Sequence, residues 1–154
     1  MNKNFTAEDI LQKHRTNIKS AQSAFSLTGI LGLIYIVRYL VTGNFDFYFS
    51  LSFTELMLRL GAEGTVSKIV SIVSITAFLA VYIVFGALAA KNSKYLPICL
   101  GVYVFDFLCL GVLLFAVRTA PVPADAYIDA IVHVFVIVFI SAGIYSHKKV
   151  GKGE

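Results

Sequence analysis

Two ionisable side chains of this chain fall inside long apolar stretches. Asp106 lies at the centre of the stretch Leu96–Val117, and His133 lies inside the stretch Ala126–Tyr145. Ionisable groups are costly in hydrocarbon, and those inside membrane proteins commonly belong to ion paths, proton relays or ligand sites. A carboxylate beside an imidazole favours a proton relay in particular, because histidine exchanges its proton near neutral pH.

Further polar residues fall on the same helical faces as this pair. Asp129 precedes His133 by four residues and Tyr103 precedes Asp106 by three, which places each pair on one face of a helix. Asp125 lies one turn before Asp129. If the two stretches are neighbouring antiparallel helices, the sequence predicts a polar column that descends from the outer surface to the middle of the membrane. Its order is Asp125, Asp129, His133 and Asp106.

Other interpretations of this column remain open. Histidine and aspartate both bind transition metals, but the sequence has no paired-histidine spacing such as His-x-x-x-His, so a metal site is the weaker interpretation. A buried structural pair, Asp106 with His133 or with Arg38, would instead specify which helices meet. Arg38 can also extend along apolar surface to the membrane interface. The sequence holds no nucleophile arranged with a base and no phosphate-loop, haem or zinc signature, so we expect no enzyme and no cofactor.

Four apolar segments are long enough to position this column across a membrane, since a spanning helix needs about 20 apolar residues. These segments are Ala24–Val41, Ile69–Ala90, Leu96–Val117 and Ala126–Tyr145. Only 14% of the residues are charged, against about a quarter in a soluble domain. The sequence therefore predicts an all-α polytopic membrane protein, a four-transmembrane-helix bundle over residues 24–146. A cytoplasmic amphipathic segment over residues 1–23 and a basic cytoplasmic tail over residues 147–154 complete the predicted organisation.

The Lys and Arg residues are concentrated on one side of the predicted membrane. Nine of the 13 lie there: Lys3, Lys13, Arg15, Lys19, Lys91, Lys94, Lys148, Lys149 and Lys152. The loops on the other side hold only Arg59, Lys68 and Arg118. Cytoplasmic loops carry the excess of these residues, so both termini are expected in the cytoplasm, in agreement with an even number of spans. Because the net charge of +4 is sorted in this way, we interpret it as membrane topology and expect no nucleic-acid partner.

The connection between the first two spans predicts an additional short helix. An aromatic run, Phe45 to Phe49, is followed by Ser52-Phe53-Thr54-Glu55, which fits a capping box, and Gly61 and Gly64 end the apolar residues that follow. Aromatic residues gather at membrane interfaces. We expect an interfacial helix that lies on the outer surface, either as an anchor or as a lid over an outward-facing pocket.

Two features of the first span and its approach also have alternative interpretations. Ala24, Thr28 and Gly32 form a stripe of small residues, which predicts close packing of helix backbones, either within the bundle or, less favoured, across a dimer. The segment before this span, residues 7–23, has helical periodicity. It is expected either to lie on anionic headgroups or to continue the first span into solvent.

The last two spans resemble a group of small, uncharacterised bacterial four-span membrane proteins. The resemblance rests on Tyr-x-x-Asp in the third span, Asp-x-x-x-His in the fourth, and a glycine before a basic tail. Here these residues are Tyr103, Asp106, Asp129, His133, Gly143 and Lys148-Lys149. The resemblance implies a bacterial plasma-membrane protein and supports the polar column, but it implies no particular activity.

Two functions follow as expectations. The first is an outward-facing polar pocket inside the membrane that binds or relays a proton, ion or small ligand, and the residues expected to carry it are Asp106, His133, Asp129, Tyr103 and Arg38. The second is a non-catalytic accessory or scaffold subunit of a larger membrane complex. A homo-oligomer or a larger membrane protein is the expected partner, besides the lipid bilayer. A relay requires a cavity that reaches the pair, whereas an accessory role predicts a dry pair and an exposed small-residue face on the first span.

Overall fold

The protein is a bundle of long helices in the structure, a computed structural model that describes residues 6–43, 51–117 and 124–152. The helices are α1 (Ala7–Thr42), α2 (Ser52–Ala62), α3 (Lys68–Lys91), α4 (Leu96–Val112) and α5 (Ala124–Lys152). A 3-10 turn, Ser93–Tyr95, leads into α4, and a π-helical turn, Leu113–Val117, extends it. Four of the helical segments are long and apolar enough to cross a membrane. The predicted all-α, multi-pass membrane fold is therefore confirmed.

Helix α1 is longer than a membrane is thick. It begins at a capping box, in which Thr6 and Asp9 exchange hydrogen bonds of 2.9 and 3.2 Å, and it ends at Gly43 in the left-handed conformation, φ +67°. Its 36 residues span about 54 Å at 1.5 Å per residue, against about 30 Å of hydrocarbon. The segment before the first span is thus a continuation of the same helix, as one of the two expectations had it.

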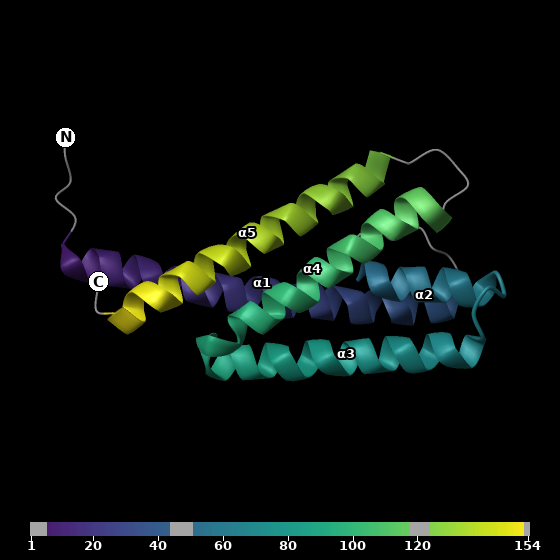
Figure 1. Ribbon diagram of the computed structural model, residues 1–154, viewed down its shortest axis with the longest axis horizontal. Coiled ribbons are helices and arrows are strands. Elements are labelled where there is room, and N and C mark those ends of the chain that lie inside the picture. Colours follow the sequence, from purple (N-terminus) through teal and green to yellow (C-terminus); the bar gives the residue numbers. More distant parts are fainter. Residues whose placement is uncertain (1–5, 44–50, 118–123, 153–154) are drawn as a thin grey trace.

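Helices α1 and α5 lie side by side over this extension (Figure 1). The two backbones approach closely where Gly143 faces Ala21, because a Cβ on Gly143 would collide with the Ala21 methyl group. One turn further, the buried Ser146 hydroxyl is 3.1 Å from both His14 Nδ1 and Asn17 Nδ2. Polar bonds outside the apolar core therefore hold the two helices in register.

The small-residue stripe of α1 packs inside this bundle. Thr28 Oγ1 is 2.5 Å from the Tyr82 hydroxyl of α3, and Gly32 is so close to Leu51 that an added Cβ would lie 2.6 Å from the leucine side chain. Phe25 stacks on Tyr82 with ring centroids 4.2 Å apart. The stripe therefore packs against Tyr82 and Leu51 of the same chain, as the packing interpretation predicts, and the dimer interpretation stays a prediction.

The position of α2 differs from the expectation. The helix is present, but it runs alongside α3 and α4 instead of lying across the ends of the spans (Figure 1). Its first turn is inside the bundle, where Leu51 is 1% exposed, and Leu56 packs with Leu110 and Leu113 of α4 and its extension. The expected capping box does not form, because the cap residue is Leu51 and it makes no side-chain cap bond.

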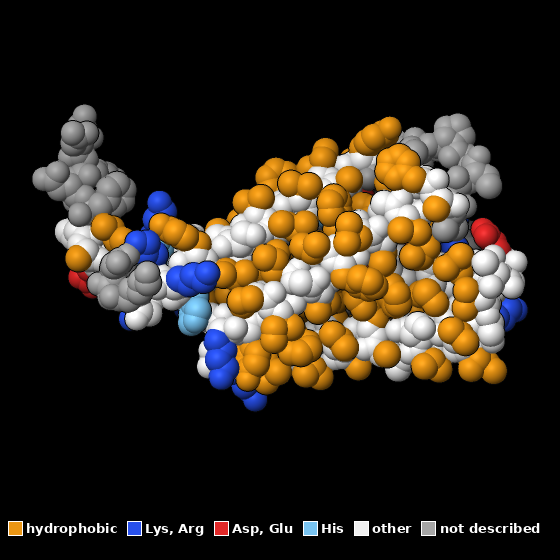
Figure 2. Space-filling model, viewed as in Figure 1, with side chains coloured by type: hydrophobic (Ala, Val, Ile, Leu, Met, Phe, Trp, Pro, Cys, Tyr) orange, Lys and Arg blue, Asp and Glu red, His pale blue; other side chains and the backbone are white. Residues whose placement is uncertain are grey.

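Charged side chains gather at the two ends of the bundle. Figure 2 shows most of the visible Lys and Arg side chains at the end that carries both termini, others with an acidic side chain at the opposite end, and apolar side chains along the face between them. Exposed apolar residues occur on every long helix, including Val41, Ile69, Phe115 and Phe135. Such a surface suits lipid as the surrounding solvent.

Candidate functional site

Asp106 caps the N-terminus of α2 from the middle of α4. Its side chain is 0% exposed. The carboxylate accepts the main-chain N–H of Ser52 at 3.2 Å through Oδ2 and that of Phe53 at 2.8 Å through Oδ1. The first N–H groups of a helix have no partner within the helix, and a negative charge is stabilised there. Asp106 therefore caps the N-terminus of α2, which the sequence predicted to be capped by Ser52 and Glu55.

His133 of α5 lies between the two aspartates. Its Nε2 is 3.2 Å from Asp106 Oδ2, and its Nδ1 is 2.9 Å from the main-chain oxygen of Asp129. Nδ1 is also 3.4 Å from Asp129 Oδ1. Both ring nitrogens therefore have partners, on opposite edges of the imidazole, and we refer to Asp106, His133 and Asp129 as the buried triad.

The partners of the imidazole restrict which of its nitrogens carries a proton. A main-chain carbonyl oxygen can only accept a hydrogen bond, so Nδ1 of His133 is assigned as the protonated nitrogen. Nε2 of the neutral ring then only accepts, and so does an ionised carboxylate. The 3.2 Å contact between Nε2 and Asp106 Oδ2 is a hydrogen bond only if a further proton lies on one of these two atoms.

Aromatic rings of α4 fix the plane of the imidazole. The ring of His133 stacks against Tyr103, with centroids 5.1 Å apart at 27°, and against Phe107, at 5.6 Å and 29°. Tyr103 and Phe107 are one helical turn apart, so they form a continuous aromatic surface. Such a surface also favours a positively charged imidazole, because the faces of aromatic rings attract cations.

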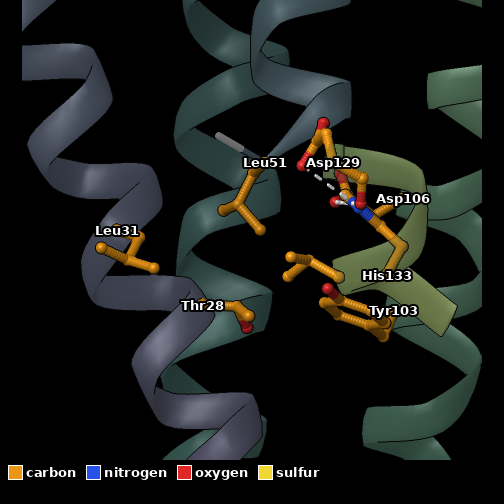
Figure 3. Close-up of a pocket in the computed structure, with 8 residues that line it drawn as sticks. Thr28, Leu31, Leu51, Tyr103, Asp106, Asp129 and His133 are labelled. Atoms are coloured by element: carbon orange, nitrogen blue, oxygen red, sulfur yellow. Dashed lines mark hydrogen bonds and ion pairs between the residues drawn. The ribbon is translucent and has the colours of Figure 1, made fainter. Parts of the chain in front are cut away.

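A small cavity adjoins the buried triad (Figure 3). Its volume is about 20 Å³, which is room for about one water molecule. The residues that line it are Thr28, Leu31, Leu51, Tyr103, Asp106, Asp129, Val132 and His133. In this conformation the cavity accommodates neither an organic ligand nor a hydrated ion.

The structure brings together four of the five residues expected at the site. Tyr103, Asp106, Asp129 and His133 are in contact or line the same cavity. Arg38 is apart from them: its side chain is exposed and borders a surface groove with Val37 and Val41. Its predicted place beside the aspartate is therefore wrong. The side chain of Asp125, the top of the expected column, lies outside the described residues.

Sequence reasoning missed the contribution of α2. Ser52 and Phe53 bind Asp106 through main-chain N–H groups, which no side-chain pattern reveals, and Leu51 closes one wall of the cavity. The available signal was Asp106 itself, because a buried carboxylate needs hydrogen-bond donors and the fourth span offered only one.

The geometry of the buried triad does not favour a metal. The two carboxylates contact opposite edges of the imidazole, so they share no point at which an ion could bind both and the ring. Within residues 6–43, 51–117 and 124–152, no cluster of three His, Cys, Asp or Glu side chains could hold a metal ion. The sequence disfavoured a metal site because of its residue spacing, and the placement of the two carboxylates disfavours one for a separate reason.

Comparisons of the chain with protein-family models, with curated proteins and with solved structures find no match. The resemblance of the last two spans to small bacterial four-span membrane proteins therefore stays a prediction. What the chain does has to be argued from the buried triad and its surroundings.

Proposed function

We propose that this protein binds and releases a proton at the buried triad, within a bacterial plasma membrane and with both termini in the cytoplasm. The observation that carries the proposal is the contact between His133 Nε2 and Asp106 Oδ2, 3.2 Å long. Two groups that both accept hydrogen bonds can bond to each other there only when a proton lies between them. Proton binding is thus a property of the resting arrangement, and its release is the functional step.

The proton would be exchanged with the side opposite the basic end of the bundle. Asp129 precedes His133 by one turn and so lies nearer that end of α5, and it is 5% exposed whereas Asp106 is 0% exposed. Once the contact between His133 and Asp106 has released its proton, a proton taken up by Asp129 replaces it. The size of the cavity supports a proton over the ion or small ligand that were also expected.

An accessory or scaffold subunit is the second candidate, and one contact favours it. The Ser52 hydroxyl is 3.4 Å from His133 Nε2 and can donate to it. In that arrangement the imidazole is neutral, no additional proton is needed, and the charge of Asp106 is balanced by the N-terminus of α2. The site would then serve only to hold helices together, and the partner would be a larger membrane protein or a second copy of this chain.

The two functions are separated by the protonation state of His133. In protein with labelled histidines in detergent micelles, NMR reports the protonation of each ring nitrogen. We expect His133 to hold a proton on both nitrogens and to lose one as the pH rises, at a pH that changes in the Asp106→Asn variant. His14 and His147, which bond to serines at the other end of the bundle, serve as internal references.

Glu63→Gln is the matched control, because it removes an exposed carboxylate from the loop after α2. It should leave the titration of His133 unchanged. If the His133 ring instead keeps one protonated nitrogen from about pH 5 to about pH 10, the proton-binding proposal fails and the accessory function is retained.

A further inference from the structure

Two hydroxyl groups outside the buried triad, those of Tyr103 and Thr28, line the cavity. Tyr103 is 1% exposed, and its ring stacks on His133. Its side chain lines the cavity, and no hydrogen bond joins its hydroxyl to another described residue. Hydroxyl groups in protein interiors are usually bonded to protein or to ordered water.

The hydroxyl is directed at the cavity. Figure 3 shows the oxygen of Tyr103 on the edge of the ring that faces Thr28 and Leu51, which together with the buried triad line the cavity. The Thr28 hydroxyl is already engaged, since it donates to the main-chain oxygen of Phe25 at 2.8 Å and contacts the Tyr82 hydroxyl at 2.5 Å. The remaining polar groups of the wall are the imidazole of His133, both of whose nitrogens have partners, and the carboxylates of Asp106 and Asp129, which accept hydrogen bonds.

We propose that the cavity binds one water molecule, which accepts a hydrogen bond from the Tyr103 hydroxyl and donates to the carboxylates of Asp129 and Asp106. Water suits this wall because it combines the two roles that the wall requires. It accepts from a hydroxyl that needs an acceptor, and it donates to carboxylates that need donors. A volume of about 20 Å³ and two to four polar partners are what a buried water requires.

This water deepens the proposed function, on which its role in proton transfer rests. It links Asp129 to Asp106 along a second route, separate from the imidazole. When Asp129 is protonated, its carboxyl donates to the water oxygen instead of accepting from the water. It then gives its proton to that oxygen while the water passes one of its own protons to the ionised Asp106 carboxylate. One O–H bond breaks and one forms at each transfer, the water is regenerated, and Asp129 is left ionised.

NMR can test for the bound water by measuring the transfer of magnetisation from water to nearby protein protons, at a single pH. In labelled protein in deuterated detergent, we expect nuclear Overhauser cross-peaks from water to the ring protons of Tyr103 and to the imidazole of His133. In Tyr103→Phe, which keeps the ring and removes the hydroxyl, the affinity for the water should fall about fivefold, the effect of one hydrogen bond, and the transfer to His133 should weaken accordingly.

Tyr82→Phe is the matched control, since Tyr82 is buried in the same core and its hydroxyl is bonded to Thr28. It should leave the cross-peaks at His133 unchanged. Wild-type protein without cross-peaks at Tyr103 overturns the water site, whether or not the variants fold. If His133 titrates but these cross-peaks are absent, the proton-binding proposal stands and the water proposal fails. If the cross-peaks are present but His133 does not titrate, the water proposal stands and the proton-binding proposal fails.

Discussion

Replacing Asp106 by alanine should release α2 from the bundle before the spans themselves unfold. The carboxylate accepts the first N–H groups of α2, from Ser52 and Phe53, and it also bonds to His133. Leu51 offers no side-chain cap of its own. Without Asp106, these buried donors lose their only acceptor among the described residues.

The expected cost follows from these contacts. Each buried donor left without an acceptor costs about 1–3 kcal/mol, so the pair of N–H groups alone costs about 2–6 kcal/mol. Removing one partner of a buried ion pair costs about 3–5 kcal/mol, which falls in the same range. We therefore expect a loss of about 3–5 kcal/mol, most of it in the docking of α2 because the long helices keep their contacts with one another.

Amide hydrogen exchange in micelles, resolved by residue, measures this loss where it occurs. A loss of 3 kcal/mol corresponds to exchange more than about a hundredfold faster in the first turn of α2, at Ser52 to Glu55. The amides of α5 around Ile140 should change far less. Asp9→Ala is the matched control, since Asp9 is the carboxylate of the capping box at the exposed start of α1, and its effect should stay within that turn.

One result would refute this reasoning. If the α2 amides exchange at the wild-type rate in a folded Asp106→Ala protein, the carboxylate does not hold the helix, and the apolar contacts of Leu56 with α4 are sufficient. If α2 and α5 lose protection by the same factor, the bundle opens as a single unit and the separate docking of α2 is wrong.

The remaining predictions concern close approaches of helices. Gly32→Ala should destabilise the protein by about 1–3 kcal/mol in a denaturation assay, because the new methyl group displaces Leu51 and with it the start of α2. Gly143→Ala should destabilise the protein at least as much. The new methyl group would meet the Cβ of Ala21, which cannot rotate away, so α1 and α5 would have to separate. Gly101→Ala is the control for both, because a Cβ there meets nothing within 4 Å, and it should be neutral or stabilise by up to about 1 kcal/mol through helix propensity. Equal effects at all three positions would contradict the packing argument.

Much of the site could be predicted because its members are related by short helical spacings. Asp129 and His133 share a face at four residues, and Tyr103 and Asp106 at three, so only the antiparallel pairing of two neighbouring spans was needed to join them. The same reasoning from helical spacing could have predicted that Arg38 lies outside the site. At about 100° per residue it points about 120° away from Gly32, which is the face of α1 that packs inward.

The placement of α2 could not be predicted in this way. Ser52 to Glu55 fit a self-contained cap, and the local pattern gave no reason to seek another acceptor. The acceptor that prevailed, Asp106, is 54 residues from Ser52 along the chain. The burial of the first turn decides which residue caps the helix. The N–H groups of a helix that begins inside a bundle need a hydrogen-bond acceptor that also lies inside the bundle.

The short length of α2 gives the bundle unequal cross-sections at its two ends. Its 11 residues span about 16 Å, or half of the thickness of the hydrocarbon. Helix α2 packs against α3 and α4 at the end of the bundle where α4 and α5 diverge from α1 and α3 (Figure 1). The described part of the bundle is therefore wider at this end. If the four long helices cross a bilayer, lipids of matching shape, and membranes curved toward the wider end, should accommodate the protein with the least elastic strain.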